Sequence, residues 1–487
     1  MSLATLAVTT DWPTALGGNR DIASFVKSYT ITRGRSSELD RSGAGTLTLV
    51  LDSPSQVFLP LSVGGSISGS LVPGRSVQVA WTLSGSTFKR FAGKTVSFTP
   101  EPTVAGGREV TIVCADEQEN FQRRETRSTL YTNIYSGCLI GSILDNAQFP
   151  SASRALDTGQ DVYEYAHFDR RKIDEVLVDI IQTEYGNGFI RGDGYYVFHD
   201  RYYRSKTATA AASFNEGMVG ITFRRDADNL RTEARVSITP KIVGTEGTIW
   251  TLQDPIAIAA SSTASFFGNY MDMTTCQLCA AGGVASPAIG IDALLNSNAS
   301  GTGTNLSASF TACIFAFAES FKAVASNGGA TNGYITRFDV TGCPIISYEQ
   351  ISRTAIDTTA CGLYGTRTLT YDAPLMSNAD KAQQFAQFLV ARYSNIANID
   401  KVSMTLVNNN ATHWEQILRR ELDDRIAVTA SAVAISGQDY FIGNLNETYA
   451  ATTGEYEVTY VLERFGIGDA FFLVDSDVVG GVRGLGY

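Results

Sequence analysis

The sequence has little of what most catalytic and metal sites are built from. Its 487 residues include only three histidines, His167, His199 and His413, which are far apart along the chain. A metal site made of histidines on one helical turn is therefore not expected, and no H-E-x-x-H run occurs. The sequence also contains no G-x-S-x-G elbow, no P-loop and no G-x-G-x-x-G fingerprint. We predict a protein that is not an enzyme and that uses no cofactor or metal.

Cysteines are few and scattered. Their number, seven, is odd, which is typical of a reduced protein made in the cytoplasm and not of a disulfide scaffold. Cys276 and Cys279 form the only close pair, and one such pair is half of a zinc site. The alternative, which we favour, is that both are small buried hydrophobic residues.

Long apolar runs are missing as well. Residues 1–12 lack a basic segment followed by a sustained apolar one, so no signal peptide is expected. No window approaches the 18 or so apolar residues of a transmembrane helix, and we predict no membrane segment.

Positive charge is also scarce, because the formal net charge is -11. Clustered lysines and arginines are what grips nucleic acid, so specific DNA binding is not expected. An acidic surface is compatible with DNA that slides past without being bound. At 44% hydrophobic and 18% charged residues, the chain is typical of a globular protein.

Carboxylates are the remaining candidates for chemistry. Asp226 with Asp228, and Asp423 with Asp424, could be acid and base, but sequence spacing alone does not identify a glycosidase pair. Turn formation is the plainer interpretation of these residues. The loop at 226–229 lacks the glycine and terminal glutamate of an EF-hand.

Short β-rich segments dominate the rest of the chain. They recur about every ten residues between glycine and proline turns, which indicates small barrels or sandwiches. We predict a mainly β (α+β) protein with five regions. They are a first β-barrel at 1–125, a helix-plus-hairpin α+β module at 126–215, a second, discontinuous β-barrel at 216–249 plus 365–465, an inserted Ala/Ser/Gly-rich β-sandwich at 250–364, and a Gly-rich tail at 466–487.

Two segments have the pattern of amphipathic helices. In 170–185, isoleucine, valine and leucine recur at i, i+3, i+4, i+7 and i+8. A β-hairpin follows, around the turn Gly192–Gly194. The second helix is expected over 378–393, with Ser377 as its N-cap.

The most distinctive stretch is 28–51, SYTITRGRSSELDRSGAGTLTLVL. Alternation of apolar and polar residues in both arms predicts a hairpin of half-buried strands. The segment between the arms carries five charges in nine residues, more than a turn requires. A solvated loop is one interpretation of this segment, and a polar clasp is the other.

The opening stretch resembles the start of phage minor tail proteins, the tail-tip or baseplate hub proteins of long-tailed bacteriophages. Weak motifs continue the resemblance in order along nearly the whole chain, although the insertion matches poorly. The segments that carry it are 29–41, 44–52, 69–74, 91–93, 116, 188–201, 224–229, 364–365, 422–426, 440–443 and 485–486.

The resemblance implies a structural protein with two related tail-tube-like barrels per chain. Three chains would form a ring that continues the six-fold tail tube, contacts the tube or distal tail protein and other tip or fibre proteins, and lets DNA pass at ejection. Such a protein would lie in the virion, at the tail tip, after assembly in the host cytoplasm.

Two other functions stay open. The insertion at 250–364 could make the chain a receptor-binding adhesin, or unpaired carboxylates could make it a tail-associated cell-wall or polysaccharide hydrolase. For the hub, we predict that a polar clasp forms a subunit or barrel contact, and that alanine at Glu38 and Asp40 weakens ring assembly more than folding. The clasp residues are Arg33, Arg35, Glu38, Asp40 and Arg41.

Overall fold

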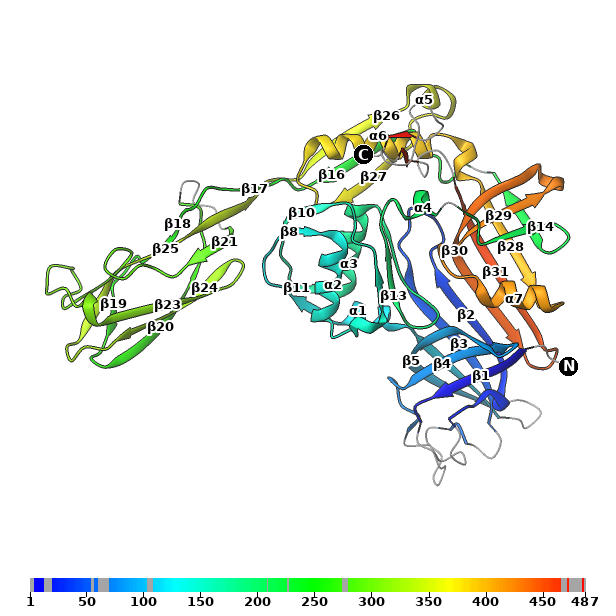
Figure 1. Ribbon diagram of the computed structural model, residues 1–487, viewed down its shortest axis with the longest axis horizontal. Coiled ribbons are helices and arrows are strands. Elements are labelled where there is room, and N and C mark those ends of the chain that lie inside the picture. Colours follow the sequence, from blue (N-terminus) through cyan, green and yellow to red (C-terminus); the bar gives the residue numbers. More distant parts are fainter. Residues whose placement is uncertain are drawn as a thin grey trace.

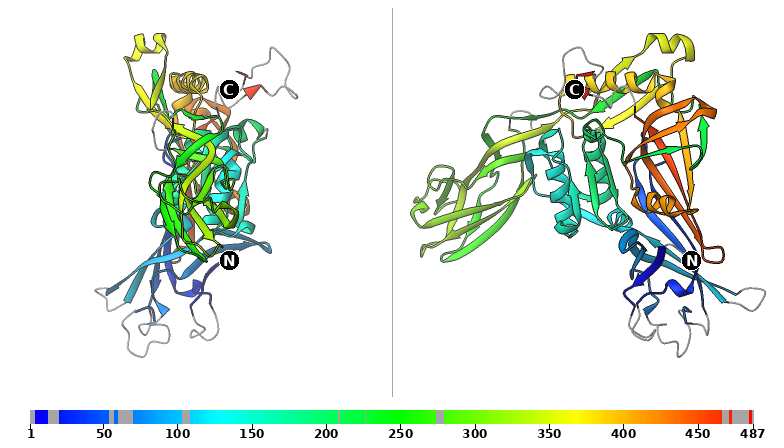
Figure 2. Two further views of the ribbon diagram at one scale, coloured as in Figure 1. Left: turned by 90° about the vertical axis from the view of Figure 1, so that its left-hand side faces the viewer. Right: turned by 45° about the vertical axis from the view of Figure 1, so that its right-hand side comes forward.

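The computed structural model describes residues 4–12, 20–53, 57–59, 70–102, 108–207, 209–225, 227–273, 279–465, 471–472 and 484–485. The described chain is mainly β, as predicted. A large twisted sheet forms one side of the molecule, helices lie near its middle, and a β-rich arm projects from the opposite side (Figures 1 and 2).

The large sheet has twelve strands. Its path runs through β1 (Ala4–Thr10), β4 (Ser76–Leu83), β5 (Ser86–Pro102), β6 (Arg108–Ala115), β3 (Gly43–Asp52), β2 (Val26–Gly34), β30 (Ile435–Ala450), β31 (Glu455–Arg464), β28 (Lys401–Val407) and β15 (Gly220–Arg224). β29 (Arg425–Ala430) pairs with β30, and β14 (Ala212–Asn215) pairs with β29. The predicted opening hairpin is confirmed as β2 and β3, in which Ile31 faces Leu47.

Strands from the two predicted barrels are joined in this one sheet. β2 pairs with β30 from Ser28 opposite Ala450 to Gly34 opposite Asn444. Among the described residues the sheet path stays open, and no closed barrel is found. The two-barrel architecture therefore stays a prediction.

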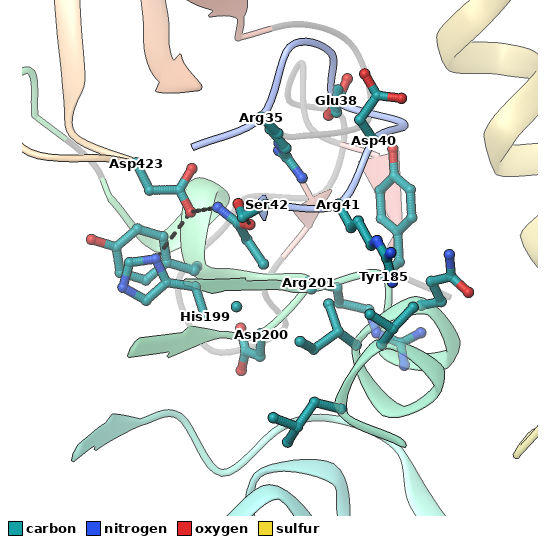
Figure 3. Close-up of a pocket in the computed structure, with 18 of the residues that line it drawn as sticks. Arg35, Glu38, Asp40, Arg41, Ser42, Tyr185, His199, Asp200, Arg201 and Asp423 are labelled. Atoms are coloured by element: carbon teal, nitrogen blue, oxygen red, sulfur yellow. Dashed lines mark hydrogen bonds and ion pairs between the residues drawn. The ribbon is translucent and has the colours of Figure 1, made fainter. Parts of the chain in front are cut away.

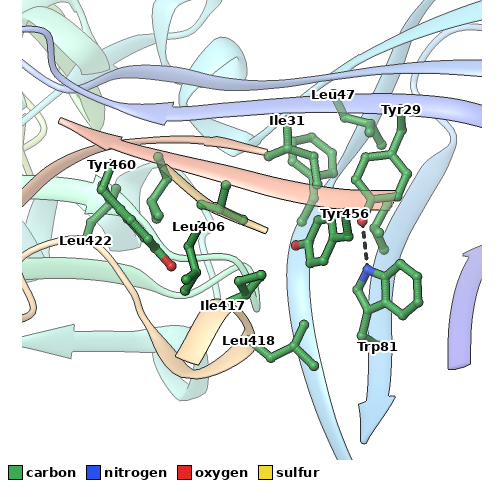
Figure 4. Close-up of a cluster of buried hydrophobic side chains, with 14 of the residues drawn as sticks. Tyr29, Ile31, Leu47, Trp81, Leu406, Ile417, Leu418, Leu422, Tyr456 and Tyr460 are labelled. Atoms are coloured by element: carbon green, nitrogen blue, oxygen red, sulfur yellow. Dashed lines mark hydrogen bonds between the residues drawn. The ribbon is translucent and has the colours of Figure 1, made fainter. Parts of the chain in front are cut away.

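Both parts of the sheet also share one hydrophobic core. Trp81 on β4 donates a hydrogen bond of 2.7 Å to the hydroxyl of Tyr29 on β2, and its ring stacks on Tyr456 of β31 (Figure 4). Helix α7 (Ala411–Arg419) adds Trp414, whose ring centroid lies 4.9 Å from that of Trp81. Apolar contacts thus hold together segments from the two ends of the chain.

The α+β module lies next to this sheet (Figure 1). Its hairpin, β12 (Asn187–Ile190) and β13 (Tyr196–His199), and its main helix, α3 (Ile173–Glu184), confirm the sequence predictions. A second hydrophobic core joins them to the helices before them. The other elements are α1 (Glu117–Arg123), β7 (Glu125–Arg127), β8 (Tyr131–Tyr135), α2 (Ser136–Asn146), β9 (Arg154–Leu156), β10 (Val162–Ala166), β11 (Asp169–Lys172) and α4 (Tyr203–Lys206).

One part of the predicted second barrel pairs elsewhere. β16 (Glu233–Ile238) joins β26 (Ile351–Ile356) and β27 (Thr368–Ala373) in a separate three-stranded sheet. Helix α6 (Ala379–Tyr393) covers this sheet with its apolar stripe, and α5 (Thr358–Tyr364) links β26 to β27. Strand partners here are more than 100 residues apart, so the local pattern could not identify them.

The cap of α6 also differs from the prediction. Asn378, and not Ser377, is the N-cap, because its side-chain oxygen accepts hydrogen bonds from the backbone N–H groups of Asp380 and Lys381 at 2.8 and 3.1 Å.

The projecting arm is built by the predicted insertion. Two sheets enclose one hydrophobic core, which is the arrangement of a sandwich. Its strands span 241–347, whereas the sequence predicted 250–364; the domain limits otherwise stay predictions. One sheet contains β17 (Lys241–Val243), β18 (Gly247–Thr251), β19 (Ile256–Ile258), β21 (Ala280–Ala285), β22 (Ala293–Asn296) and β25 (Gly333–Ser347). The other contains β20 (Ser262–Asn269), β24 (Ser320–Asn327) and β23 (Phe310–Ala316).

Of the predicted tail, only β32 (Phe471–Phe472) and β33 (Gly484–Leu485) are described, as a short parallel pair. Asp226 and Cys276 lie outside the described residues.

Candidate functional site

The charged loop between β2 and β3 lies where the main sheet, the α+β module and helix α6 meet. Three of the predicted clasp residues, Arg33, Arg35 and Glu38, have side chains between 2 and 14% exposed. Asp40 and Arg41 are exposed. The loop is therefore half buried, and its two halves have different surroundings.

The first group of buried charges centres on Glu447 of β30, and we refer to it as the Glu447 cluster. The side chain of Glu447 is fully buried and accepts hydrogen bonds from Arg90 of β5, the shortest at 2.6 Å. Tyr456 donates its hydroxyl to the same carboxylate. Arg33 lies 3.7 Å from it and bonds Glu421 at 2.7 Å. Each charge in the cluster thus has an opposite partner, as burial requires.

Arg90 has its remaining donors satisfied by the backbone. It donates to the carbonyl oxygens of Leu418, in the last turn of helix α7, and of Arg420, which follows the helix, at 3.0 and 2.9 Å. Arg90 thereby links strand β5, in the N-terminal part of the sheet, to the end of helix α7, which packs against the C-terminal part.

The second group, which we call the Glu463 cluster, centres on Glu463 of β31. Arg35 forms a two-pronged bond with this carboxylate at 2.8 and 2.7 Å. Arg204 of α4 also bonds Glu463 and reaches Asp423 at 2.7 Å. His199 shares Asp423 through its Nδ1 atom, at 3.0 Å. The cluster joins the loop, the hairpin of the module and β31.

Glu38 extends this cluster to helix α6. Its carboxylate accepts from the Nε of Arg392 at 2.9 Å and lies 2.9 Å from a second nitrogen of the same guanidinium. Arg204 lies 3.4 Å from it. The exposed half of the loop has weaker links: Asp40 accepts from Ser36 at 2.6 Å, and Arg41, 57% exposed, lies 3.3 Å from Asp174 of α3.

A pair of glycines allows the backbones to come close enough for these bonds. Gly34 has φ of +101°, and a Cβ there would lie 2.3 Å from the carbonyl oxygen of Gly443. That same oxygen accepts a hydrogen bond of 2.9 Å from the N–H of Arg35. A side chain at Gly34 would force β2 away from β30.

The arginines keep the central carboxylates ionised. Burial opposes the ionised form of Glu463, but Arg35 and Arg204 outweigh it, so the pKa lies below its ordinary value. Asp423 behaves similarly: Arg204 and His199 outweigh the effect of burial, and its pKa is strongly lowered. Asp423 therefore belongs to an ion-pair network, whereas burial raises the pKa of the neighbouring Asp424.

Asp116 is a buried carboxyl that has no close ion pair within the described residues. It caps helix α1 by accepting the N–H of Gln118 at 3.0 Å and also accepts the N–H of Gly45 at 2.7 Å. Burial raises its pKa to about 7, although both hydrogen bonds and Arg33 act in the opposite direction. Asp116 thus links strand β3 to the start of the module.

A pocket of about 80 Å³ lies beside the Glu463 cluster (Figure 3). The loop at 35–42 forms one wall, and helix α3 and the hairpin form the others. On its floor the ring of His199 stacks on Tyr203, with centroids 3.4 Å apart. Its walls include charged side chains that pair with each other, such as Asp423 with Arg204 and Asp174 with Arg41, so the pocket lies at a joint between elements.

Most partners of the loop were missed by the sequence analysis. A signal was present, because Glu447 stands at an inward position of its strand between the buried Leu445 and the partly buried Tyr449. A charge at such a position must find a buried partner. The missed residues are Arg90, Arg204, Arg392, Glu421, Glu447 and Glu463, and Asp423 was named there without this role.

The described residues lack two further kinds of feature. No three His, Cys, Asp or Glu side chains come together there as metal ligands would. None of the helices in the same part of the chain combines the length and the apolar character needed to cross a bilayer.

Comparison with solved structures identifies the fold. The 43 kDa tail protein of prophage MuSo2 from Shewanella oneidensis superposes with a TM-score of 0.52 and 10% identity, over 95% of this chain and 98% of that one. The tail protein from Neisseria meningitidis MC58 gives 0.52 and 11%, over 96% and 98%. No protein-family model and no curated protein matches the sequence. The chain therefore has the fold of phage tail proteins, and the resemblance predicted from the sequence is confirmed at that level.

Proposed function

We propose that this chain is a structural, non-enzymatic hub protein of a bacteriophage tail tip. Three copies form a ring that continues the tail tube and connects it to the distal tail protein and to tip or fibre proteins. DNA passes through the ring at ejection without specific binding. The chain is made in the host cytoplasm and becomes part of the virion.

The observation that carries this proposal is the fold shared with two phage tail proteins over nearly the full length of all three chains. The sheet has two parts, which meet where β2 pairs with β30. Three copies would supply six such parts, the number needed to follow a tube of six-fold symmetry.

The ends of the sheet support contacts between copies. Among the described strands, β1 pairs only with β4 and β15 pairs only with β28. Segment 20–22 covers part of β1, because Ile22 donates to the carbonyl of Val8 and Thr10 donates to that of Arg20. Edge strands offer backbone groups to a neighbouring chain, so we assign the subunit contacts to these two ends.

Net charge agrees with a passage for DNA. At -11 per chain, the ring would carry an excess of negative charge. Proteins hold DNA phosphates with clustered lysines and arginines. A ring with an excess of negative charge would therefore not retain the DNA that passes through it.

Native mass spectrometry of the full chain tests the ring. We expect an assembly of three times 52.4 kDa, and a labelled chain should appear at the tip of purified particles by electron microscopy. A copy number per particle that is not divisible by three, or a label spread along the tail, would contradict the proposal.

The exposed half of the loop is our candidate for a contact with a neighbouring subunit. Asp40 and Arg41 have only weak links within the chain. A double Asp40→Ala, Arg41→Ala variant should form less trimer at equal concentration while its melting temperature stays within about 2 °C of the parent. Equal loss of trimer and of thermal stability would place the contact inside one chain.

A further inference from the structure

Three residues form a row across the outer face of the small sheet in the projecting sandwich. In β20, Phe267 is directly opposite Lys322 of β24, and Lys322 is directly opposite Phe315 of β23. Directly paired residues point to the same side of an antiparallel sheet. The order across the three strands is therefore phenyl, ammonium, phenyl, and we refer to it as the Phe–Lys–Phe row.

Both rings of the row are open to solvent. Phe267 is 69% exposed and Phe315 is 55% exposed. The opposite face of the same strands carries the apolar residues of the sandwich core, such as Phe321, which is fully buried. Two large phenyl rings on a flat outer face contribute nothing to this core, and exposed apolar groups of this kind mark interaction surfaces.

The cation of the row lacks an acidic partner. Within the described chain no carboxylate forms an ion pair with Lys322, and its Nζ lies 6.0 Å from the ring centroid of Phe267. Such an unpaired lysine contrasts with the net charge of -11. The nearby Glu319 reaches His167 of the module instead. The other outer positions of the three strands carry mostly small polar residues, together with Val324 and Cys313, which face each other beside the row. The polar residues are Thr263, Ser265, Asn269, Thr311, Ser320 and Ser326.

We propose that the Phe–Lys–Phe row binds an anionic, β-linked polysaccharide that crosses the three strands. Neighbouring strands are about 4.8 Å apart, so the two phenyl residues are separated by about 10 Å. Sugar rings of an extended β-linked chain follow one another at nearly the same interval as the strands. The two phenyl rings thus stack on sugars i and i+2, and the acidic group of sugar i+1 meets Lys322.

The chemistry of the row favours a saccharide over a protein. Stacking of a sugar's C–H face on a phenyl ring needs a flat, accessible aromatic surface, and hydroxyl and amide side chains around it suit the sugar hydroxyls. A protein partner that covered this face would require a continuous apolar patch, whereas the two phenyl rings here are separated by an ammonium group. The arm carries the row away from the main sheet (Figures 1 and 2). This binding goes beyond the hub function and does not depend on it.

Calorimetry with the full chain tests the proposal with hyaluronan decasaccharide, a β-linked chain in which acidic and neutral sugars alternate. A neutral chitin hexasaccharide is the comparison. We expect the parent chain to bind hyaluronan at least tenfold more tightly than the neutral chain. The Phe267→Ala, Phe315→Ala variant should lose at least tenfold in affinity for both probes, because both stack on the rings.

Substitutions at Lys322 separate charge from stacking. Lys322→Ala should abolish the preference for hyaluronan and leave binding of the neutral chain unchanged, whereas Lys322→Arg should restore the preference. Ile291→Ala, an equally exposed apolar residue of the same sandwich, is the matched control and should bind as the parent does. Thermal unfolding and trimer formation should be unchanged in all these variants.

The proposal is overturned if the parent chain binds neither probe, or if the double phenylalanine variant binds as the parent does. It is also overturned if the Ile291→Ala control loses as much affinity as that variant. A chain that binds no saccharide but still forms trimers would refute the row as a glycan site and leave the hub function standing.

Discussion

The joint around the charged loop and the outer face of the sandwich reverse the usual distribution of side chains. The Glu447 and Glu463 clusters bury ionised groups, and the Phe–Lys–Phe row exposes phenyl rings. The buried charges have partners within the chain, so removing one should damage folding. The exposed rings have no partner in the core, so removing them should damage only what binds there. A residue that has a partner within the chain is therefore expected to stabilise the fold, and an exposed residue without one is available to other molecules.

The largest expected effect is at Glu447. Glu447→Gln should lower the free energy of unfolding by about 3–5 kcal/mol, because it removes the carboxylate that pairs with the buried guanidinium of Arg90, whereas Arg33 keeps Glu421 as its partner. Urea unfolding followed by circular dichroism measures the change. Glu455→Gln, at an exposed position of the neighbouring strand, is the control and should stay within about 0.5 kcal/mol of the parent. A small effect of Glu447→Gln would mean that the Glu447 cluster does not stabilise the fold.

Glu38 should have the next largest effect. Glu38→Gln is expected to cost about 2–3 kcal/mol, since Arg392 is almost fully buried and loses its charged acceptor. Its neighbour in the loop, Asp40, is exposed, and Asp40→Asn should change stability by less than about 0.5 kcal/mol. These contacts lead us to expect that Glu38 contributes to folding, and its effect on ring assembly stays a prediction. Equal changes at both positions would remove the distinction between the halves of the loop.

Asp116 provides a test by pH. Its pKa is about 7 in the folded chain and near 3.8 when unfolded, so between these values the folded state binds more protons. Stability from this group therefore falls as pH rises from about 4 to 7, and the loss is complete above pH 7. Relative to Asp116→Asn, the parent should lose about 2–3 kcal/mol between pH 5 and 8 in urea unfolding experiments. A pH-independent difference would show that the folded pKa is not raised.

The smallest effect is expected on the sandwich face. Phe315→Ala should change the free energy of unfolding by less than about 0.5 kcal/mol, because the ring is exposed. Phe321→Ala removes a fully buried ring from the adjacent strand and should cost about 3–5 kcal/mol. Differential scanning calorimetry compares the two. A large loss at Phe315 would mean that its ring supports the fold and is not held free for a ligand.

Local patterns predicted the elements well where burial repeats within a few residues. The hairpin of β2 and β3 and the stripe of α3 follow from such repeats. Helix α1 has no apolar stripe from which it could be predicted, because its seven residues include just one apolar side chain, Phe121. The sequence placed residues 233–238 in the region of the second barrel but gave no strand partner for them, because the partners of β16 come from residues beyond 350.

The sequence by itself determined that the chain is mainly β, that a hairpin opens it, and that the loop within that hairpin carries more charge than a turn needs. Only the tertiary structure decided where those charges go. Arg33 bonds a glutamate 388 residues away in sequence, and Arg35 bonds one 428 residues away. Period-two burial is a property of neighbouring residues, whereas a buried charge is stable only beside a partner that folding of the whole chain brings to it.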